Sequence, residues 1–239
     1  MKTTCGTLFP VRKSPAVLVA AILLLLGCSV TAYGADAAAD SIFACVFTPG
    51  HWDRADWIQF KFPQGDHFGD WVQQDKCIAN QVPKHATPEE LQGKLAAETY
   101  SSMVYKEKVL GNVTIASTMA FAHQMAPLIL LTLALAENAK GQQECSERFE
   151  IVIFNEGVNV WRHFLKEGKL TYRKAAFASF RLEKDTPYRL EVKKTGKTLT
   201  VSVAGHTFGY TDDALPDACY VGVTGCEGLN RFYNFSICR

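Results

Sequence analysis

The segment FNEGVNVWRHF, residues 154–164, places three side chains that could contact a polar ligand at alternate positions: Asn159, Trp161 and His163. Residues 155–157 are typical of a turn, and those after it are typical of a strand. Because successive side chains of a strand point to opposite faces, the three would share one face. An indole offers a flat apolar surface, while an amide and an imidazole form hydrogen bonds, so the pattern favours a binding surface. The alternative is that Trp161 fills the core beside a buried His163.

A second group of polar residues lies in CEGLNRFY, residues 226–233. Glu227, Asn230 and Arg231 gather beside a glycine-containing turn, where Arg231 could pair with Glu227 or bind an acidic group of a ligand. The alternative is that the group shapes the turn and fixes the last strand to its sheet. Both interpretations stay open from the residues alone.

The sequence predicts no metal site and no cofactor. Asp212, Asp213 and Asp217 form an acidic cluster, but their spacing does not match a calcium-binding EF-hand loop. No cysteine pair has CxxC spacing, and no cysteine has a histidine nearby at the spacing of zinc ligands. A phosphate-binding P-loop, a dinucleotide fingerprint and a Gly-x-Ser-x-Gly nucleophile elbow are all missing from the sequence.

These residues need a scaffold, and the pattern of apolar residues from about Ser41 onward predicts one built from strands. The run at 128–136 is apolar throughout, and we expect a fully buried central strand there, since it follows Pro127 and is too short to span a membrane. A hairpin with Gly196 in its turn is also predicted. The predicted strands are 41–47, 56–62, 98–109, 113–123, 128–136, 148–154, 158–164, 177–183, 188–194, 198–205, 219–225 and 231–237. Ten or more short strands in one domain predict an all-β fold, an antiparallel β-sandwich.

One short helix is expected near residues 87–98, TPEELQGKLAAE. Thr87 is suited to the N-cap, Pro88 to the first helical position, and Glu90 to the reciprocal contact of a capping box. Gly93 weakens the helix in its middle, so we expect it to be short.

Composition limits the kind of partner. The chain has 239 residues, of which 48% are hydrophobic, which is enough to form the core of one large domain at 41–239. Lys and Arg number 25 against 24 Asp and Glu, which gives a net charge of +1. A nucleic-acid partner would need a basic stripe, and the sequence has none, so no nucleic-acid partner is predicted.

Residues 1–34 predict export. A basic start is followed by AVLVAAILLLLG at 16–27, an apolar run of signal-peptide length. Two endings are possible. LLGC at 25–28 is similar to a bacterial lipobox, in which Cys28 would become a lipidated N-terminus attached to a membrane. Alternatively, small residues at 32–34 would allow ordinary cleavage before Ala35. Either ending predicts a protein of the periplasm or the cell surface.

Cysteine usage is consistent with export. Six cysteines remain after the signal region: Cys45, Cys77, Cys145, Cys219, Cys226 and Cys238. An even number in an oxidising compartment indicates disulfides, with fifteen possible pairings. Free, buried thiols are the alternative.

The hairpin YRLEVKKTGKTLTVSVAGHTFGYTDD at 188–213 and the following YVGVTGCEGLNRFYNFSI at 220–237 give the chain a recognisable C-terminal half. This half resembles the concanavalin A-like, laminin-G-like jelly rolls of exported bacterial proteins, a class that includes the 3-keto-disaccharide hydrolase domain. The resemblance covers about the last hundred residues, and the first half matches only by its number of strands. It indicates a fold rather than an activity, because this fold is used by lectins, hydrolases, lyases and adhesive modules.

The resemblance also implies where a site and a disulfide would lie. Such sandwiches bind glycans across one concave sheet, which would place Asn159, Trp161 and His163 on that surface. Laminarinase-type hydrolases of this fold carry Glu-x-Asp-x-x-Glu on one strand. The nearest segment here, EIVIFNE at 150–156, lacks the motif, because Val152 replaces the aspartate and Glu156 lies six residues from Glu150, in the turn. Glu150 could still act alone as a base, although an isolated strand glutamate is more often part of an ion pair.

In this fold the first and last strands usually lie side by side. We therefore expect a Cys45–Cys238 disulfide, which needs Cα atoms within about 7 Å of each other.

Three functions follow from the sequence. The first is an exported jelly-roll protein that binds carbohydrate, with Asn159, Trp161, His163, Glu150, Glu227 and Arg231 as candidate ligand contacts. The second is a glycan-active hydrolase or lyase that uses the same face, with unassigned catalytic residues. The third is a structural or adhesive module without a small ligand. Whether the protein is an enzyme is left open by the sequence.

Overall fold

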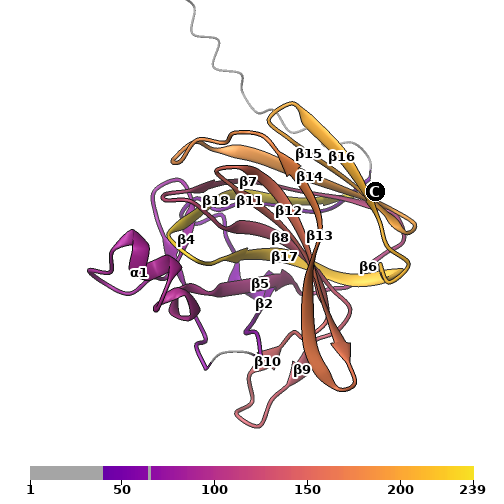
Figure 1. Ribbon diagram of the computed structural model, residues 1–239, viewed down its shortest axis with the longest axis horizontal. Coiled ribbons are helices and arrows are strands. Elements are labelled where there is room, and N and C mark those ends of the chain that lie inside the picture. Colours follow the sequence, from indigo (N-terminus) through magenta and orange to yellow (C-terminus); the bar gives the residue numbers. More distant parts are fainter. Residues whose placement is uncertain (1–39, 64–65) are drawn as a thin grey trace, which may run out of the picture. The chain divides into compact units, whose positions relative to one another are not determined.

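The computed structural model describes residues 40–63 and 66–239, and these form two antiparallel sheets packed face to face (Figure 1). The predicted signal segment and the lipidation site at Cys28 lie outside the described residues. Sheet A has the strand order β16-β15-β14-β7-β18-β4-β3, with β1 also paired to β18. Sheet B has the order β13-β12-β11-β8-β17-β5-β2, with β6 also paired to β17. The prediction of an antiparallel jelly-roll sandwich is confirmed.

The strands of sheet A are short at one edge and long elsewhere. Their bounds are β1 (Ser41–Val46), β3 (Trp71–Gln73), β4 (Ile78–Asn80), β7 (Val113–Phe121), β14 (Tyr188–Thr195), β15 (Thr198–Val203), β16 (His206–Thr211) and β18 (Asn230–Cys238). The hairpin predicted around Gly196 joins β14 to β15, and Gly196 has the positive φ of +53° that such a turn needs. Strands β3, β4 and β16 were not predicted from the sequence.

Sheet B contains the opening segment of the sequence and the buried apolar run. Its strands are β2 (Trp57–Phe60), β5 (Ser101–Tyr105), β6 (Val109–Leu110), β8 (Pro127–Thr132), β11 (Arg148–Phe154), β12 (Gly157–Lys166), β13 (Lys169–Ser179) and β17 (Ala218–Gly225). Strand β8 is fully buried and lies between β11 and β17, as predicted. A separate two-stranded ribbon, β9 (Ala136–Glu137) and β10 (Gln143–Glu144), extends from one end.

The long hairpin β12–β13 differs from its prediction. A turn at residues 155–156 starts β12 at Gly157, as expected, but β13 begins at Lys169 rather than at 177. Strand β13 is longer than predicted because all ten residues of β12 pair with it. Gly157 has a φ of +131°, and a Cβ there would lie 2.0 Å from the carbonyl oxygen of Ala178, so the turn requires glycine.

The predicted helix forms but is interrupted. α1 spans Pro88–Gln92 and has the predicted capping box between Thr87 and Glu90. It ends at Gly93, and a short 3-10 helix, η2 (Ala96–Thr99), continues the segment. Another 3-10 turn, η1 (Arg54–Asp56), precedes β2. None of the helices in the described part of the chain is long and apolar enough to cross a membrane.

The core lies between the sheets and is made of alternate residues from each strand. Sheet B contributes Ile129, Leu131, Phe149, Ile151, Val158, Val160, Val221 and Val223, and sheet A contributes Ile115, Met119, Leu190, Val192, Phe232, Phe235 and Ile237. Each fully buried side chain of this size stabilises the fold by roughly 1.5–3 kcal/mol relative to exposure. The packing fixes which face of each strand is turned outward.

The disulfide prediction is wrong for the structure as described. All six cysteines from Cys45 to Cys238 are free thiols. Strands β1 and β18 do lie side by side, but Cys45 is opposite Phe235 and Cys238 is opposite Ser41. Four residues of strand separate the two positions, which is about 13 Å and too far for a bridge.

Candidate functional site

The outer face of sheet B, which is the face turned away from the core, carries the residues singled out from the sequence. Because Val158 and Val160 point into the core, Asn159, Trp161 and His163 point outward. Strand β11 has the same alternation and adds Glu150, which lies directly opposite Trp161 in the register of the two strands. Trp161 therefore lies outside the core between the sheets, and it packs partly buried against a second apolar cluster on the outer face.

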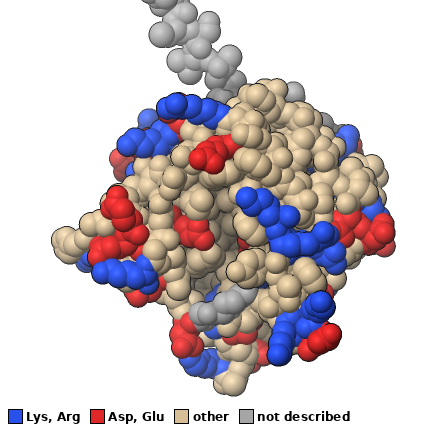
Figure 2. Space-filling view, viewed as in Figure 1, with Lys and Arg blue, Asp and Glu red and all other residues tan. Residues whose placement is uncertain are grey.

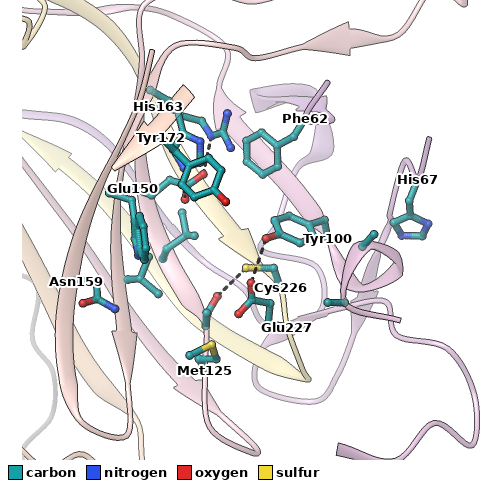
Figure 3. Close-up of a pocket in the computed structure, with 17 residues that line it drawn as sticks. Phe62, His67, Tyr100, Met125, Glu150, Asn159, His163, Tyr172, Cys226 and Glu227 are labelled. Carbon is teal, nitrogen blue, oxygen red and sulfur yellow. Dashed lines mark hydrogen bonds and ion pairs between the residues drawn. The ribbon is translucent and has the colours of Figure 1, made fainter. Parts of the chain in front are cut away.

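These side chains line a cavity of about 470 Å³. Figure 3 shows how its walls rise from loops that are far apart in the sequence. Strands β8, β11 and β12 form the floor, and one wall comes from the segment of η2 and Tyr100. The residues that line it are Phe62, His67, Ala96, Ala97, Tyr100, Met125, Ala126, Leu128, Arg148, Glu150, Val152, Asn159, Trp161, His163, Tyr172, Cys226 and Glu227. A second apolar cluster, which includes Phe60, Phe62 and Leu130, supports the cavity from the side.

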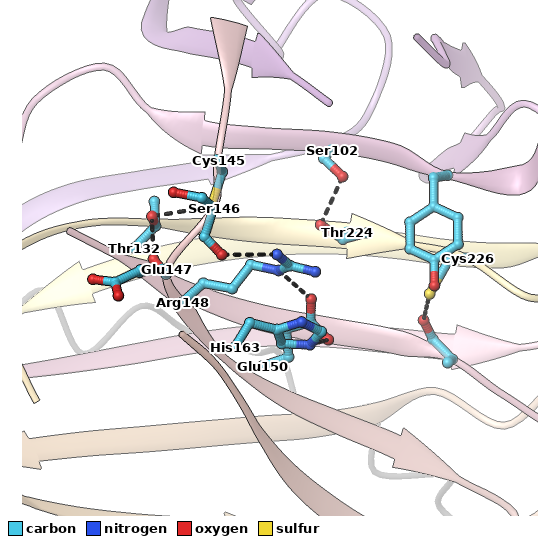
Figure 4. A network of polar contacts seen from close by, with 12 residues as sticks. Ser102, Thr132, Cys145, Ser146, Glu147, Arg148, Glu150, His163, Thr224 and Cys226 are labelled. Carbon is cyan, nitrogen blue, oxygen red and sulfur yellow. Dashed lines mark hydrogen bonds and ion pairs between the residues drawn. The ribbon is translucent and has the colours of Figure 1, made fainter. Parts of the chain in front are cut away.

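Glu150 is held by two cationic or hydrogen-bonding partners on the cavity floor (Figure 4). Arg148 Nε donates to its Oε1 at 2.5 Å, and His163 Nε2 lies 3.1 Å from its Oε2. Burial by itself would raise the pKa of Glu150, but the charge of Arg148 and the contact with His163 outweigh it and hold the pKa at about 2. The carboxylate is therefore ionised across the physiological range. Arg148 also lies over the ring of Phe62, with its guanidinium carbon 3.8 Å from the ring centroid.

Glu227 is the second carboxyl group of the cavity, and unlike Glu150 it has no cationic partner among the described residues. Its nearest polar contact is the hydroxyl of Tyr100, 3.5 Å from Oε1. Burial raises the pKa of Glu227, and the negative charge of Glu150 raises it further. Two carboxyl groups thus share one cavity, one held ionised and the other biased toward its protonated form.

The loop that carries Glu227 is fixed by buried amides. Asn80 donates from Nδ2 to the carbonyls of Thr99 and Gly228, at 2.7 and 2.9 Å, and its Oδ1 accepts from the amide of Asn230 at 2.7 Å. The backbone amide of Glu227 donates to Thr99 Oγ1 at 2.6 Å. Glu227 itself has a φ of +52°, a left-handed conformation that these contacts maintain.

Three residues that line the cavity each have a polar atom without a hydrogen-bond partner in the described part of the chain. The atoms are Oδ1 of Asn159, Nδ1 of His163 and Nε2 of His67, and all three are buried from solvent. Most buried polar atoms in proteins are paired, because leaving one unpaired costs about 1–3 kcal/mol. Because these atoms are closed to solvent, a ligand in the cavity could reach them only after a movement of the side chains.

The structure brings together five of the six predicted site residues: Asn159, Trp161, His163, Glu150 and Glu227. Arg231 is not among them. It lies on β18 of sheet A and forms an ion pair with Asp185 at 2.9 Å rather than with Glu227. The acidic loop residue Asp212 accepts hydrogen bonds from Arg162, Arg173 and Tyr210. In residues 40–63 and 66–239, no cluster of His, Cys, Asp or Glu is arranged to hold a metal ion.

Several cavity residues were missed by sequence reasoning. Phe62 and Tyr100 lie just beyond the observed ends of β2 and β5, although strands were predicted there, and Met125 and Cys226 lie in loops where no periodic pattern marks a face. Tyr172 was missed because its strand was predicted to begin later. Arg148 could have been found, since it lies two residues before Glu150 on the same face of the strand.

Comparisons with known proteins establish the fold. No family model matches the chain, and no curated protein matches it. Among solved structures, the chain is similar to carbohydrate-binding module CBM66 from Bacillus subtilis, with a TM-score of 0.52 and 9% identity over 77% of this chain and 96% of that one. It is also similar to the exoplasmic/lumenal domain of VIP36 in its Ca2+/Man3GlcNAc-bound form, with a TM-score of 0.52 and 12% identity over 82% and 87%.

A third similar structure is the β-porphyranase BpGH16B from the human gut bacterium Bacteroides plebeius, with a TM-score of 0.54 and 10% identity over 82% of this chain and 89% of that one. The chain has a concanavalin A-like jelly-roll fold. At these identities the similarity concerns the fold alone, so the function of this chain has to be argued from its own cavity.

Proposed function

We propose that this protein binds carbohydrate in the cavity on the outer face of sheet B. The observation that carries the proposal is that Trp161, Asn159 and His163 line one cavity on the outer face of sheet B. A sugar ring has an apolar face of C–H groups and a rim of hydroxyls. Trp161 offers a surface for stacking, and the polar side chains of Asn159 and His163 in the cavity lining are of the kind that bonds to the rim.

Three of the similar structures are of proteins whose names or bound ligands concern carbohydrate, which is consistent with this proposal. One is a carbohydrate-binding module, one is bound to Man3GlcNAc, and one is a porphyranase. Each shares the two-sheet scaffold of this chain, although their residues differ at nine positions in ten.

The test is the variant Trp161→Ala, examined on a glycan array and by thermal melting. Removing the stacking surface should abolish glycan retention, whereas the fold should persist because Trp161 lies outside the core between the sheets and is only partly buried against the second apolar cluster. Val72→Ala is the control, since Val72 is an exposed apolar residue on sheet A. If Trp161→Ala bound every glycan as well as the unaltered protein, the cavity would not be the site, and a structural or adhesive module would be favoured.

A second candidate function is hydrolysis or elimination of a glycan in the same cavity. The observation that favours it is the pair Glu150 and Glu227, which line one cavity with pKa values shifted in opposite directions. In a hydrolase, Glu227 would donate its proton to the glycosidic oxygen as its bond to the anomeric carbon breaks. Glu150 would stabilise the positive charge that develops on that carbon. Water would then add to the carbon in place of the leaving group and return a proton to Glu227.

This candidate is tested by incubating the protein with each glycan that it retains and measuring new reducing ends or unsaturated products. Glu227→Gln should lower turnover roughly 10²–10⁴-fold and leave glycan binding intact. Glu156→Gln is the control, because Glu156 lies in the exposed turn before β12. If the unaltered protein releases no product from a glycan that it binds, only the binding function remains.

We also propose that the protein is exported, with lipidation at Cys28 or cleavage before Ala35. The support is the apolar run at 16–27 and the LLGC segment. Mass measurement of the purified native protein tests it. A mature chain that retains Met1 would rule out both forms of processing.

A further inference from the structure

Strand β13 extends the cavity face sideways as a shelf, defined here by Tyr172, Lys174 and Phe177. In the register of β12 and β13, Tyr172 is opposite His163, Lys174 is opposite Trp161, and Phe177 is opposite Asn159. Cross-strand partners project from the same face of a sheet. The shelf side chains therefore lie beside the three residues of the proposed sugar site.

A β-bulge makes this arrangement possible. The register shifts by one residue between Val160 and Trp161, so that Ala175 and Ala176 both pack toward the core. Without the extra residue, Lys174 and Phe177 would point to opposite faces. With it, the ammonium of Lys174 lies 5.6 Å from the ring centroid of Trp161 and 5.3 Å from that of Phe177.

The aromatic side chains of the shelf are unusually open to solvent. Tyr172 is 65% exposed and Phe177 is 47% exposed. The ring of Tyr172 meets Trp161 edge to face, with centroids 6.1 Å apart. Two exposed aromatic rings that flank a cavity offer further stacking surfaces next to Trp161.

The charge of the shelf sets it apart from the rest of a nearly neutral chain. The hairpin β12–β13 carries five basic residues, Arg162, Lys166, Lys169, Arg173 and Lys174, against one acidic residue, Glu167. Arg162 and Arg173 both pair with Asp212, whose single negative charge offsets one of the two positive charges. Figure 2 shows the basic side chains gathered over this hairpin, beside the hollow of the molecular surface.

Lys174 is the uncompensated cation next to the cavity. Among the described residues it forms no ion pair, whereas Lys106, Lys140 and Lys197 each have an acidic partner. Within the cavity the charge of Arg148 is balanced by Glu150. An anion that extends from the cavity over Trp161 would thus meet a positive charge at the shelf.

We infer that the shelf is a second subsite that takes the anionic group of an acidic oligosaccharide, with Lys174 pairing a carboxylate or sulfate ester of a ring stacked on Tyr172 or Phe177. This inference rests on the proposed binding of a sugar ring in the cavity. The inference adds that the sugar ring next to the one in the cavity carries an acidic group. The preference for an acidic glycan should weaken as salt is raised, because the shelf is open to solvent.

The experiment measures the affinity of the full chain by titration calorimetry for two matched pairs of probes. The first pair is an oligogalacturonate and its methyl ester, and the second is a sulfated galacto-oligosaccharide and its desulfated form. We expect one acidic member to bind about tenfold more tightly than its neutral partner, a difference of ~1.4 kcal/mol. A preference within the first pair would identify a carboxylate as the recognised group, and a preference within the second pair would identify a sulfate ester.

Variants of the shelf then assign the preference to Lys174. Lys174→Gln should remove the tenfold preference and leave affinity for the neutral probe unchanged, and Lys174→Glu should reverse the preference. Lys193→Gln is the matched control, because Lys193 is an exposed strand lysine on sheet A. An acidic preference that persists in Lys174→Gln would overturn the inference.

The possible failures are distinguishable. Equal binding of the acidic and neutral members of both pairs by the unaltered protein would overturn the inference and leave the proposed function in place. If the protein bound no glycan of either pair or of an array, the proposed function itself would fail, and the inference with it.

Discussion

The same three-residue pattern, Arg-x-Glu, occurs on an outward face of each sheet, with opposite outcomes. On β11 of sheet B, Arg148 and Glu150 are in contact at 2.5 Å with only 3% and 10% of their side chains exposed. On β14 of sheet A, Arg189 and Glu191 are 3.4 Å apart with 47% and 41% exposed. In both, the middle residue, Phe149 or Leu190, is buried in the core.

The difference comes from what covers each face. On sheet A the pair is exposed to water, where an ion pair contributes little to stability. Loops and the second apolar cluster enclose the pair of sheet B, which turns the same spacing into a buried charge network beside a cavity. The local sequence sets which side chains face away from the core. Segments distant in the chain decide whether those side chains are exposed to solvent or line a cavity.

Removing the arginine from each pair should give the largest difference in the free energy of unfolding between the two sheets. Arg148→Ala leaves Glu150 buried with its main cationic partner missing, and we expect it to lower the free energy of unfolding by about 3–5 kcal/mol. Arg189→Ala should lower it by less than about 1 kcal/mol. Urea unfolding of the two variants measures both values, and equal losses would mean that burial does not separate the pairs.

Acid should weaken the buried pair over a defined pH range. The pKa of Glu150 lies at about 2 in the folded protein against an ordinary 4.5, so its contribution is fully present above pH 4.5 and is lost as the pH falls toward 2. The shift of about 2.5 pH units corresponds to roughly 3 kcal/mol. We therefore expect the stability difference between the unaltered protein and Glu150→Gln to shrink by that amount between pH 6 and pH 2.

The measurement is urea unfolding at several pH values, with Glu191→Gln as the control on the exposed face. A difference between the unaltered protein and Glu150→Gln that stayed constant from pH 6 to pH 2 would contradict the depressed pKa of Glu150.

Two amides give a smaller contrast. Asn80 makes three buried hydrogen bonds that fix the loop of Glu227, and Asn80→Ala should cost about 2–3 kcal/mol by leaving their partners unpaired. The side chain of Asn234, on β18 of sheet A, is partly exposed; its Oδ1 accepts from the backbone amide of Thr118 and its Nδ2 donates to Thr118 Oγ1. Asn234→Ala should cost about 1 kcal/mol. Melting curves compare the two, and a larger loss for Asn234 would contradict the role assigned to Asn80.

Reductant should have the smallest effect, because no disulfide joins the described cysteines. We expect the same melting temperature with and without dithiothreitol. Burial raises the pKa of Cys145 to about 11 and that of Cys226 well above its usual range, so both should resist thiol reagents until the protein unfolds. The partly exposed Cys238 should react first. A drop in melting temperature on reduction would show that a disulfide forms after all.

The sequence by itself determined the fold class and the fact that Asn159, Trp161 and His163 share one face of a strand. Both depend on the alternation of side chains along a strand, which is a local property. The capping box at Thr87 and Glu90 and the glycine turns at Gly157 and Gly196 were also set locally, because each depends on a few neighbouring residues.

Only the tertiary structure decided which outward residues became a site. It brought Glu227 from the end of β17 to Glu150 on β11 and sent Arg231, four residues further along, to Asp185 on the other side of the sandwich. It also set the register of β1 against β18, which separates Cys45 from Cys238. Register and loop packing depend on contacts between segments distant in the chain, which no local pattern of residues encodes.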